Sequence, residues 1–301
     1  NITDTLIQEM QKGKGFRSIN SFSGEFDGNN NIINNIYSYK QDEAGFILSL
    51  NNASLKNLTI RGKIYSIGNY AGIISKGSGK IENITSATNI YGGVGAGLIG
   101  CCTGTLNIKE CTNFGNIEST SAVGGICGDQ FVGEMVNCIN QGTIKSSSSN
   151  NYGVAGLCGN NSSQTIIKNC MNSGTIIYDG QKNVWYFGGT GGIIGLNRNT
   201  LTVKNCVNMG KIQSTSFAGA ICGMELNHWQ GKEKYELTNS FMLNNVKLAT
   251  GSIADTSATV FEIDDIQDVI TNLNKYINDN ELTEEGWNIW TLGEDGYPTF
   301  K

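Results

Sequence analysis

The sequence predicts an all-β solenoid, built as a parallel β-helix of about seven to eight coils. Three observations lead to this fold class: an internal repeat, short β-forming segments within each copy, and small residues at matching positions. The chain has 301 residues, of which 40 are glycine and one is proline. A repeat of a few tens of residues is typical of solenoids, in which each unit buries its apolar face against its neighbours.

The repeat is clearest in residues 124–144, GGICGDQFVGEMVNCINQGTI. Seven copies open with a small residue, at Ala44, Ala71, Ala96, Gly124, Ala155, Gly191 and Gly219. Successive starts lie 27, 25, 28, 31, 36 and 28 residues apart. A small residue at each opening favours a tight corner, where a larger side chain would collide with the next coil.

Apolar residues recur at two further positions of the repeat. The first column contains Leu55, Ile81, Ile108, Met135, Ile167, Val203 and Leu237. The second contains Ile64, Ile90, Ile117, Ile144, Ile176, Ile212 and Val246. The apolar runs are too short for helices, and Gly, Asn and Ser bound them, as is typical of short strands. Each copy is therefore expected to form one coil with two or three such strands.

Cysteine also recurs in two columns, although the total of nine is odd. The first column contains Cys111, Cys138, Cys170 and Cys206, and the second contains Cys127, Cys158 and Cys222. Aliphatic residues occupy most of these positions in other copies, so we expect buried free thiols. Disulfides between adjacent coils are the alternative, since strands about 4.8 Å apart bring cysteines within bridging range. Cys101 and Cys102 lie outside both columns, in an expected turn, and are the predicted reactive thiols.

An asparagine column accompanies the first cysteine column. Asn113, Asn140, Asn172 and Asn208 each follow a cysteine by two residues and precede a glycine by two. Asparagine tolerates left-handed backbone angles, and stacked amides can bond one another between strands. We interpret this column as a structural ladder.

Both ends of the chain differ from the repeats. We expect one structural domain with an N-terminal cap over residues 1–21, β-helix repeats over 22–250 and a C-terminal capping segment over 251–301. Thr5 and Gln8 have the spacing of a helical capping box. Apolar residues at helical spacing across 263–277 predict a helix. An aromatic tail follows, and we expect helix and tail to cover the last coil, because open strand edges need protection.

The repeat resembles the GLUG motif, whose Gly-Leu-hydrophobic-Gly signature is present in AGLIG at 96–100 and AGLCG at 155–159. Residues 22–29, FSGEFDGN, are similar to the lead-in of such proteins, and the ending from Trp287 to Pro298 is similar to their close. The resemblance covers roughly residues 20–300. It implies an extracellular, right-handed β-helical module, often classed with adhesion and found beside the peptidase domain of immunoglobulin A proteases. The motif itself brings no catalytic residues.

Composition and motif content argue against several classes of function. Charged residues make up 16% of the chain and the net charge is −5, so no basic surface for nucleic acid is expected. No apolar run reaches membrane-spanning length. A zinc peptidase motif of the His-Glu-x-x-His type is excluded, because His228 is the single histidine. We predict no catalytic residue, no metal site and no cofactor, and a monomer.

A carbohydrate-active enzyme, either a polysaccharide lyase or a glycosidase, is the alternative, because such enzymes use carboxylates gathered in a groove. Asp129 and Glu134 share one turn, but no two adjacent copies stack a convincing pair.

Two insertions, at residues 177–190 and 224–236, predict a binding surface. They carry the candidate binding residues Trp185, Tyr186, Phe187, His228, Trp229 and Tyr235. Insertions in solenoids often mark the binding face, and exposed aromatics dominate many contacts. Alternatively, these side chains fold back and shield the coil. The sequence thus favours a non-catalytic extracellular or cell-surface module for adhesion or for binding a host or cell-surface glycan or protein. A passive spacer for another domain remains open.

Overall fold

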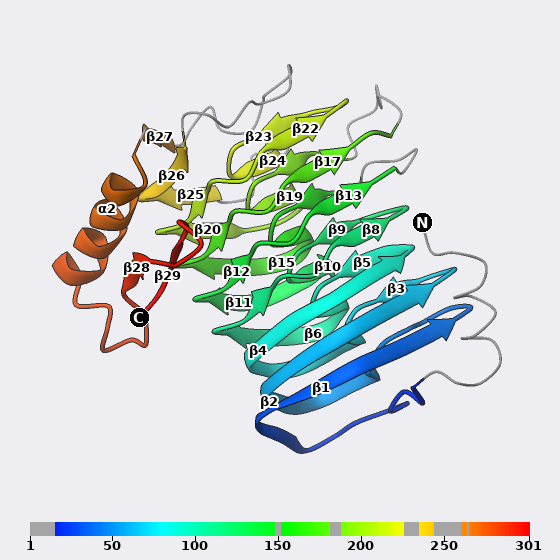
Figure 1. Cartoon of the computed structure of the whole chain (residues 1–301). Coiled ribbons are helices and arrows are strands. Elements are labelled where there is room, and N and C mark those ends of the chain that lie inside the picture. Colours follow the sequence, from blue (N-terminus) through cyan, green and yellow to red (C-terminus); the bar gives the residue numbers. More distant parts are fainter. Residues whose placement is uncertain (1–15, 148–151, 181–187, 226–234, 244–259, 264) are drawn as a thin grey trace.

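The computed structural model describes residues 16–147, 152–180, 188–225, 235–243, 260–263 and 265–301. Its strands form a 21-stranded sheet, a six-stranded sheet and a two-stranded antiparallel hairpin. Within the described ranges there is one helix, α2 (Ile266–Asp279), with Asp265 as its N-cap. Figure 1 shows the strands of successive repeats lying side by side in layers, with α2 against one side of them.

The large sheet takes at least one strand from every repeat. It contains β1 (Glu25–Lys40), β2 (Ile47–Ser66), β4 (Ile74–Gly92), β6 (Ile99–Lys109), β7 (Thr112–Asn113), β8 (Ile117–Ser119), β10 (Cys127–Asp129), β11 (Phe131–Val136), β12 (Ile139–Asn140), β13 (Ile144–Ser146), β15 (Cys158–Lys168), β16 (Met171–Asn172), β17 (Ile176–Tyr178), β19 (Ile194–Asn197), β20 (Leu201–Lys204), β21 (Val207–Asn208), β22 (Ile212–Ser214), β24 (Cys222–Glu225), β25 (Tyr235–Thr238), β26 (Ser240–Leu243) and β27 (Val260–Ile263).

The small residues that open the repeats build the six-stranded sheet. It contains β3 (Tyr70–Ala71), β5 (Val94–Ala96), β9 (Val123–Gly124), β14 (Val154–Ala155), β18 (Thr190–Gly191) and β23 (Ala218–Gly219). The hairpin near the C-terminus consists of β28 (Trp290–Leu292) and β29 (Pro298–Phe300). A Cβ atom placed on Gly125 would lie 2.1 Å from the carbonyl oxygen of Gly156. The corner therefore requires glycine, as predicted from the repeat.

The predicted fold class, a right-handed parallel β-helix of about seven to eight coils with separate short strands and end caps, is wrong. The described strands instead join into one dominant 21-stranded sheet beside the six-stranded sheet. β1, β2 and β4 are 16, 20 and 19 residues long. Asn57 and Asn83, with φ of 54° and 50°, bend their strands at left-handed positions while the parallel pairing of β2 with β4 continues on both sides. Asparagines that were expected to end a strand therefore only bend it, and the strand continues beyond them.

The predicted alignment of columns between repeats is confirmed. Parallel pairing places Leu55, Ile81, Ile108, Met135, Ile167, Val203 and Leu237 in one continuous register. The second column is continuous from Ile64 to Ile212, while Val246 lies outside the described residues. Side chains of both columns are buried wherever the structure gives their exposure, except for the partly buried Leu237. Hydrophobic burial along the register is thus the main source of stability.

The C-terminal segment lies along the side of the repeats, which corrects the expected cap over the last coil. Trp290 Nε1 donates to Asn169 Oδ1, 121 residues earlier in the chain. Val269, Ile270, Leu273, Ile277 and Trp287 belong to one apolar cluster with residues of the repeats, among them Ile139, Met171 and Val207. The helix itself was predicted correctly. The position of the helix was not predicted correctly, because the repeats present a second apolar surface against which the helix packs. The N-terminal helix expected around Thr5 and Gln8 lies outside the described residues.

All nine cysteines have free, buried thiols. This confirms the inward placement predicted for both cysteine columns. The exposed, reactive positions predicted for Cys101 and Cys102 are wrong, because both lie in β6 and are only 3% and 4% exposed. Burial raises the pKa of Cys101 to about 12 and that of Cys102 to about 11. Thiols that ionise so late are poor nucleophiles at neutral pH.

Candidate ligand-binding surface

Three tyrosines form a stacked ladder on the outer face of the first long strands. Tyr39, Tyr65 and Tyr91 are register partners in β1, β2 and β4. Their ring centroids are 5.2 Å and 4.7 Å apart, and the ring planes differ by 11° and 8°. Each of the three tyrosines is half-buried, so part of each residue remains accessible to a ligand. Burial, followed by the neighbouring phenols, raises the pKa of Tyr65. The central tyrosine of the ladder therefore presents a neutral hydroxyl group at neutral pH.

The ladder arises from a period in the sequence. Tyr39, Tyr65 and Tyr91 are 26 residues apart, which is one repeat, so parallel register brings them together. Side chains alternate between faces along a strand, so Lys63 and Asn89 share the outer face with the tyrosines. Sequence reasoning missed this site because it searched the insertions for aromatics. A search for tyrosine at the repeat period would have found it.

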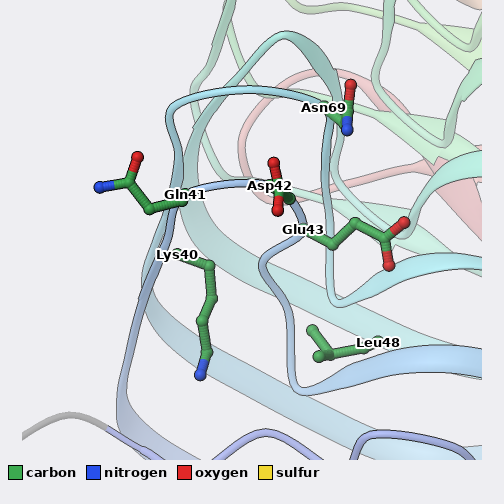
Figure 2. Close-up of a pocket in the computed structure, with 6 residues that line it drawn as sticks. All are labelled: Lys40, Gln41, Asp42, Glu43, Leu48 and Asn69. Carbon is green, nitrogen blue, oxygen red and sulfur yellow. The ribbon is translucent and has the colours of Figure 1, made fainter.

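An open hollow of about 740 Å³ lies at the corner that follows the first tyrosine. Figure 2 shows its lining residues, Lys40, Gln41, Asp42, Glu43, Leu48 and Asn69. Tyr39 directly precedes Lys40, so the hollow begins one residue after the first tyrosine of the ladder. Glu43 Oε1 lies 2.6 Å from Lys76 Nζ, and both side chains are about a quarter to a third exposed. The hollow thus offers carboxylates, amides and an ammonium group around one leucine.

A row of polar side chains continues from this corner across the following repeats. The Tyr70 hydroxyl interacts with the Cys101 thiol, and burial raises the pKa of Tyr70 to about 12. Lys76, Cys101 and Asp129 are register partners. Burial also raises the pKa of Asp129, although a hydrogen bond with Asn160 and the charge of Arg198 oppose the shift. Each ionisable side chain of the row interacts with a neighbouring side chain, so the row has few hydrogen-bonding groups left for a ligand.

Most of the binding residues predicted from the sequence lie outside the described residues: Trp185, Tyr186, Phe187, His228 and Trp229. Tyr235 is described, as the first residue of β25. Its half-buried ring packs against the apolar interior. This position favours the shielding role for Tyr235, and the other five assignments stay predictions.

The described part of the chain contains no group of three or more His, Cys, Asp or Glu side chains placed to hold a metal ion. None of its helices combines the length and the apolar character needed to cross a bilayer.

The fold is similar to that of a Bacteroides ovatus protein whose crystal structure is described as "a putative immunoglobulin A1 protease". The TM-score is 0.59 at 18% sequence identity, and the similarity covers 92% of this chain and 77% of that chain. At this identity the similarity shows a shared fold only. No protein family model matches the chain, and no curated protein matches it.

Proposed function

We propose that the chain is a non-catalytic binding module, secreted or at the cell surface, that holds a carbohydrate along the tyrosine ladder and in the adjoining hollow. The observation that carries this proposal is the stacked ladder of Tyr39, Tyr65 and Tyr91, directly followed in the chain by the residues that line a polar hollow. Sugar hydroxyls donate and accept hydrogen bonds, as do phenols and amides, while carboxylates accept and ammonium groups donate. Tyrosine adds apolar contact area beside its polar group.

The extracellular location and membership of the GLUG repeat family belong to the same proposal. Their support is the repeat signature at 96–100 and 155–159, together with the fold shared with the Bacteroides ovatus protein. Two alternatives remain as outcomes of the test. A carbohydrate-active enzyme would use carboxylates such as Asp42 and Glu43 in the hollow, and a passive spacer would bind nothing.

The test is a glycan array probed with the whole chain and with a Tyr65→Ala variant. Tyr65 is the central ring, so its removal leaves both neighbours without a stacking partner. We expect the variant to lose about tenfold or more in affinity for any glycan that the chain binds. Tyr297→Ala is the matched control, because Tyr297 is an exposed tyrosine of the C-terminal hairpin region, outside the ladder.

Undiminished binding by Tyr65→Ala would reject the ladder as the site. In that case, loss of binding in Trp185→Ala combined with Trp229→Ala, at an unchanged melting temperature, would assign the ligand to the insertions. Release of unsaturated or reducing sugars from a polymer would instead establish an enzyme.

A further inference from the structure

A second asparagine ladder follows the outer bend of the repeats. It contains the residues that directly precede the first cysteine column and its equivalents: Asn57, Asn83, Glu110, Asn137, Asn169, Asn205 and Asn239. All seven have φ between 45° and 54°. Side-chain amides bond between layers, from Asn83 to Asn57 at 2.9 Å and from Asn169 to Asn137 at 2.8 Å. Glu110 interrupts the ladder.

The middle of this ladder binds residues 286–288 of the chain's own C-terminal segment. Asn137 Nδ2 donates to the carbonyl oxygen of Gly286 at 2.9 Å, and the backbone N–H of Asn288 donates to Asn137 Oδ1 at 3.2 Å. Asn169 Nδ2 donates to the carbonyl oxygen of Asn288 at 2.8 Å. The side chain of Asn137 thus satisfies a peptide N–H and a carbonyl two residues apart. A neighbouring β-strand would do the same with its main chain.

This binding is possible because the ladder leaves capacity unused. A carboxamide has two N–H donors and an oxygen with two lone pairs. Between layers, Asn137 uses its oxygen to accept from Asn169, and its N–H groups remain for other partners. The C-terminal segment takes one of these donors and the second lone pair.

The same ladder continues into the first long strands, where no described residue of the C-terminal segment forms a hydrogen bond with it. Asn57 Nδ2 donates to Asp27 Oδ1 at 3.0 Å, and its oxygen accepts from Asn83, so the described residues leave one donor and one lone pair unused at Asn57. Asn83 donates to Asn57 and Asn30. No hydrogen bond to Asn83 Oδ1 is found in the described part of the chain, where the next ladder position is Glu110, which lacks the amide N–H groups of asparagine. Asn57 is half-buried and Asn83 is exposed.

The surface beside the ladder also differs between its two parts. Beside Asn137 and Asn169, the next outward column holds Ile139 and Met171, which lie in the apolar cluster with α2 and the tail. The same column holds Thr59 and Thr85 beside Asn57 and Asn83, and these threonines are half-buried. The part of the ladder at Asn57 and Asn83 therefore lacks an apolar surface on which a tryptophan could pack, but it has room for small or β-branched side chains.

We propose that Asn57 and Asn83 form a docking edge for an extended peptide segment of a partner protein. The ladder binds the main chain of this segment, just as Asn137 and Asn169, later in the same ladder, bind the main chain of residues 286–288. Its side chains toward Thr59 and Thr85 are small or β-branched and uncharged. Lys56 adds no free charge to the edge, because it pairs with Glu25 at 2.5 Å and with Asp27 at 3.6 Å. The proposal does not depend on carbohydrate binding, because the proposed carbohydrate site is the separate ladder of Tyr39, Tyr65 and Tyr91.

The experiment measures binding of a labelled peptide, Glu-Gly-Thr-Asn-Ile-Thr-Thr, to the whole chain by fluorescence anisotropy. This peptide copies residues 285–291 with both tryptophans replaced by threonine. The test variant is Asn57→Gly with Asn83→Gly, because glycine keeps the left-handed backbone while removing the amide. We expect affinity to fall about tenfold or more in this variant. An ester in place of the amide N–H at the peptide's asparagine should weaken binding to a similar extent.

Asn51→Gly is the matched control, since Asn51 is an exposed asparagine of β2 outside the ladder. It should leave affinity unchanged. Equal binding by the Asn57→Gly, Asn83→Gly variant, or equal binding of the ester peptide, would overturn the proposal. Binding lost in Asn137→Gly but retained in the test variant would also overturn it, because the peptide would then be displacing the chain's own tail. Equal melting temperatures of variant and control exclude misfolding as the cause.

Discussion

The first long strands and the later repeats share one register but fill it with different side chains. In β2 and β4 the inward column holds Ile60 and Ser86, and the outer face carries exposed or half-buried groups. In the later repeats the same inward column becomes Asn113, Asn140, Asn172 and Asn208, and α2 with the tail covers the outer face. The comparison teaches that register alone fixes which residues meet. The polarity of those residues decides whether the surface they form is covered by another segment or exposed to solvent.

The largest expected effect comes from uncovering the later repeats. Trp290 is almost fully buried, packs against the tilted ring of Phe300 at a centroid distance of 4.1 Å and donates to Asn169. We expect Trp290→Ala to cost about 3–5 kcal/mol in the stability of the C-terminal segment. Hydrogen exchange should show faster exchange in α2 and unchanged exchange in β2. Unchanged protection in α2 would show that the tail does not hold the helix in place.

The inner asparagine ladder should be the next most sensitive element. Asn140 Nδ2 donates to Asn172 and to the carbonyl oxygen of Gly142, and its oxygen accepts from Asn113. Asn140→Ala leaves three buried polar groups with fewer partners, so we expect a loss of about 3 kcal/mol or more. Ile60→Val, in the same column of β2, should cost only about 0.5–1.5 kcal/mol. Equal losses in urea unfolding would contradict the contrast between the regions.

Buried thiols should make the later repeats sensitive to pH. Burial moves the pKa of Cys101 from 9.0 to about 12. The unfolded thiol ionises near pH 9 while the folded one keeps its proton, so this contribution is complete below about pH 9 and is lost between about pH 9 and 12. Urea unfolding should show a smaller fall in stability across this range for Cys101→Ala. An unchanged pH profile would reject the role of Cys101.

The same thiols provide a test of burial. A thiol reagent at pH 8 should modify none of the nine cysteines quickly in folded protein, and all nine after unfolding. Rapid modification of Cys101 or Cys102 would show that β6 opens.

The smallest expected effect lies in the tyrosine ladder. Tyr65→Leu keeps apolar volume but removes two stacking contacts, each worth about 0.5–1.5 kcal/mol at most on an exposed face. We expect a decrease in melting temperature of a few degrees and a weaker near-ultraviolet circular dichroism signal. A loss as large as that for Asn140→Ala would show that the ladder is structural and would weaken its proposed role in binding.

The sequence predicted the column register, the buried cysteine columns and the inner asparagine ladder, because each depends on identical residues one repeat apart. It did not predict the long continuous strands. Asn57 and Asn83 look like turn residues in a sequence, and whether pairing continues past them depends on the neighbouring strand. The position of the C-terminal segment depends on contacts such as Trp290 with Asn169, which no local pattern encodes. Cys101 and Cys102 were misplaced because the strand β6 was taken for a turn.

Every repeat has a part of fixed length around its left-handed ladder residue and a part of variable length. Ten residues run from Leu55 to Ile64, and the same count separates the equivalent positions Met135 and Ile144 or Val203 and Ile212. All variation in repeat length falls in the remaining stretch, which includes 177–190. New sequence could therefore be inserted into that stretch of any repeat while the ten-residue part, which carries both asparagine ladders, keeps its length. The chain would then serve as a scaffold with a constant core and variable loops.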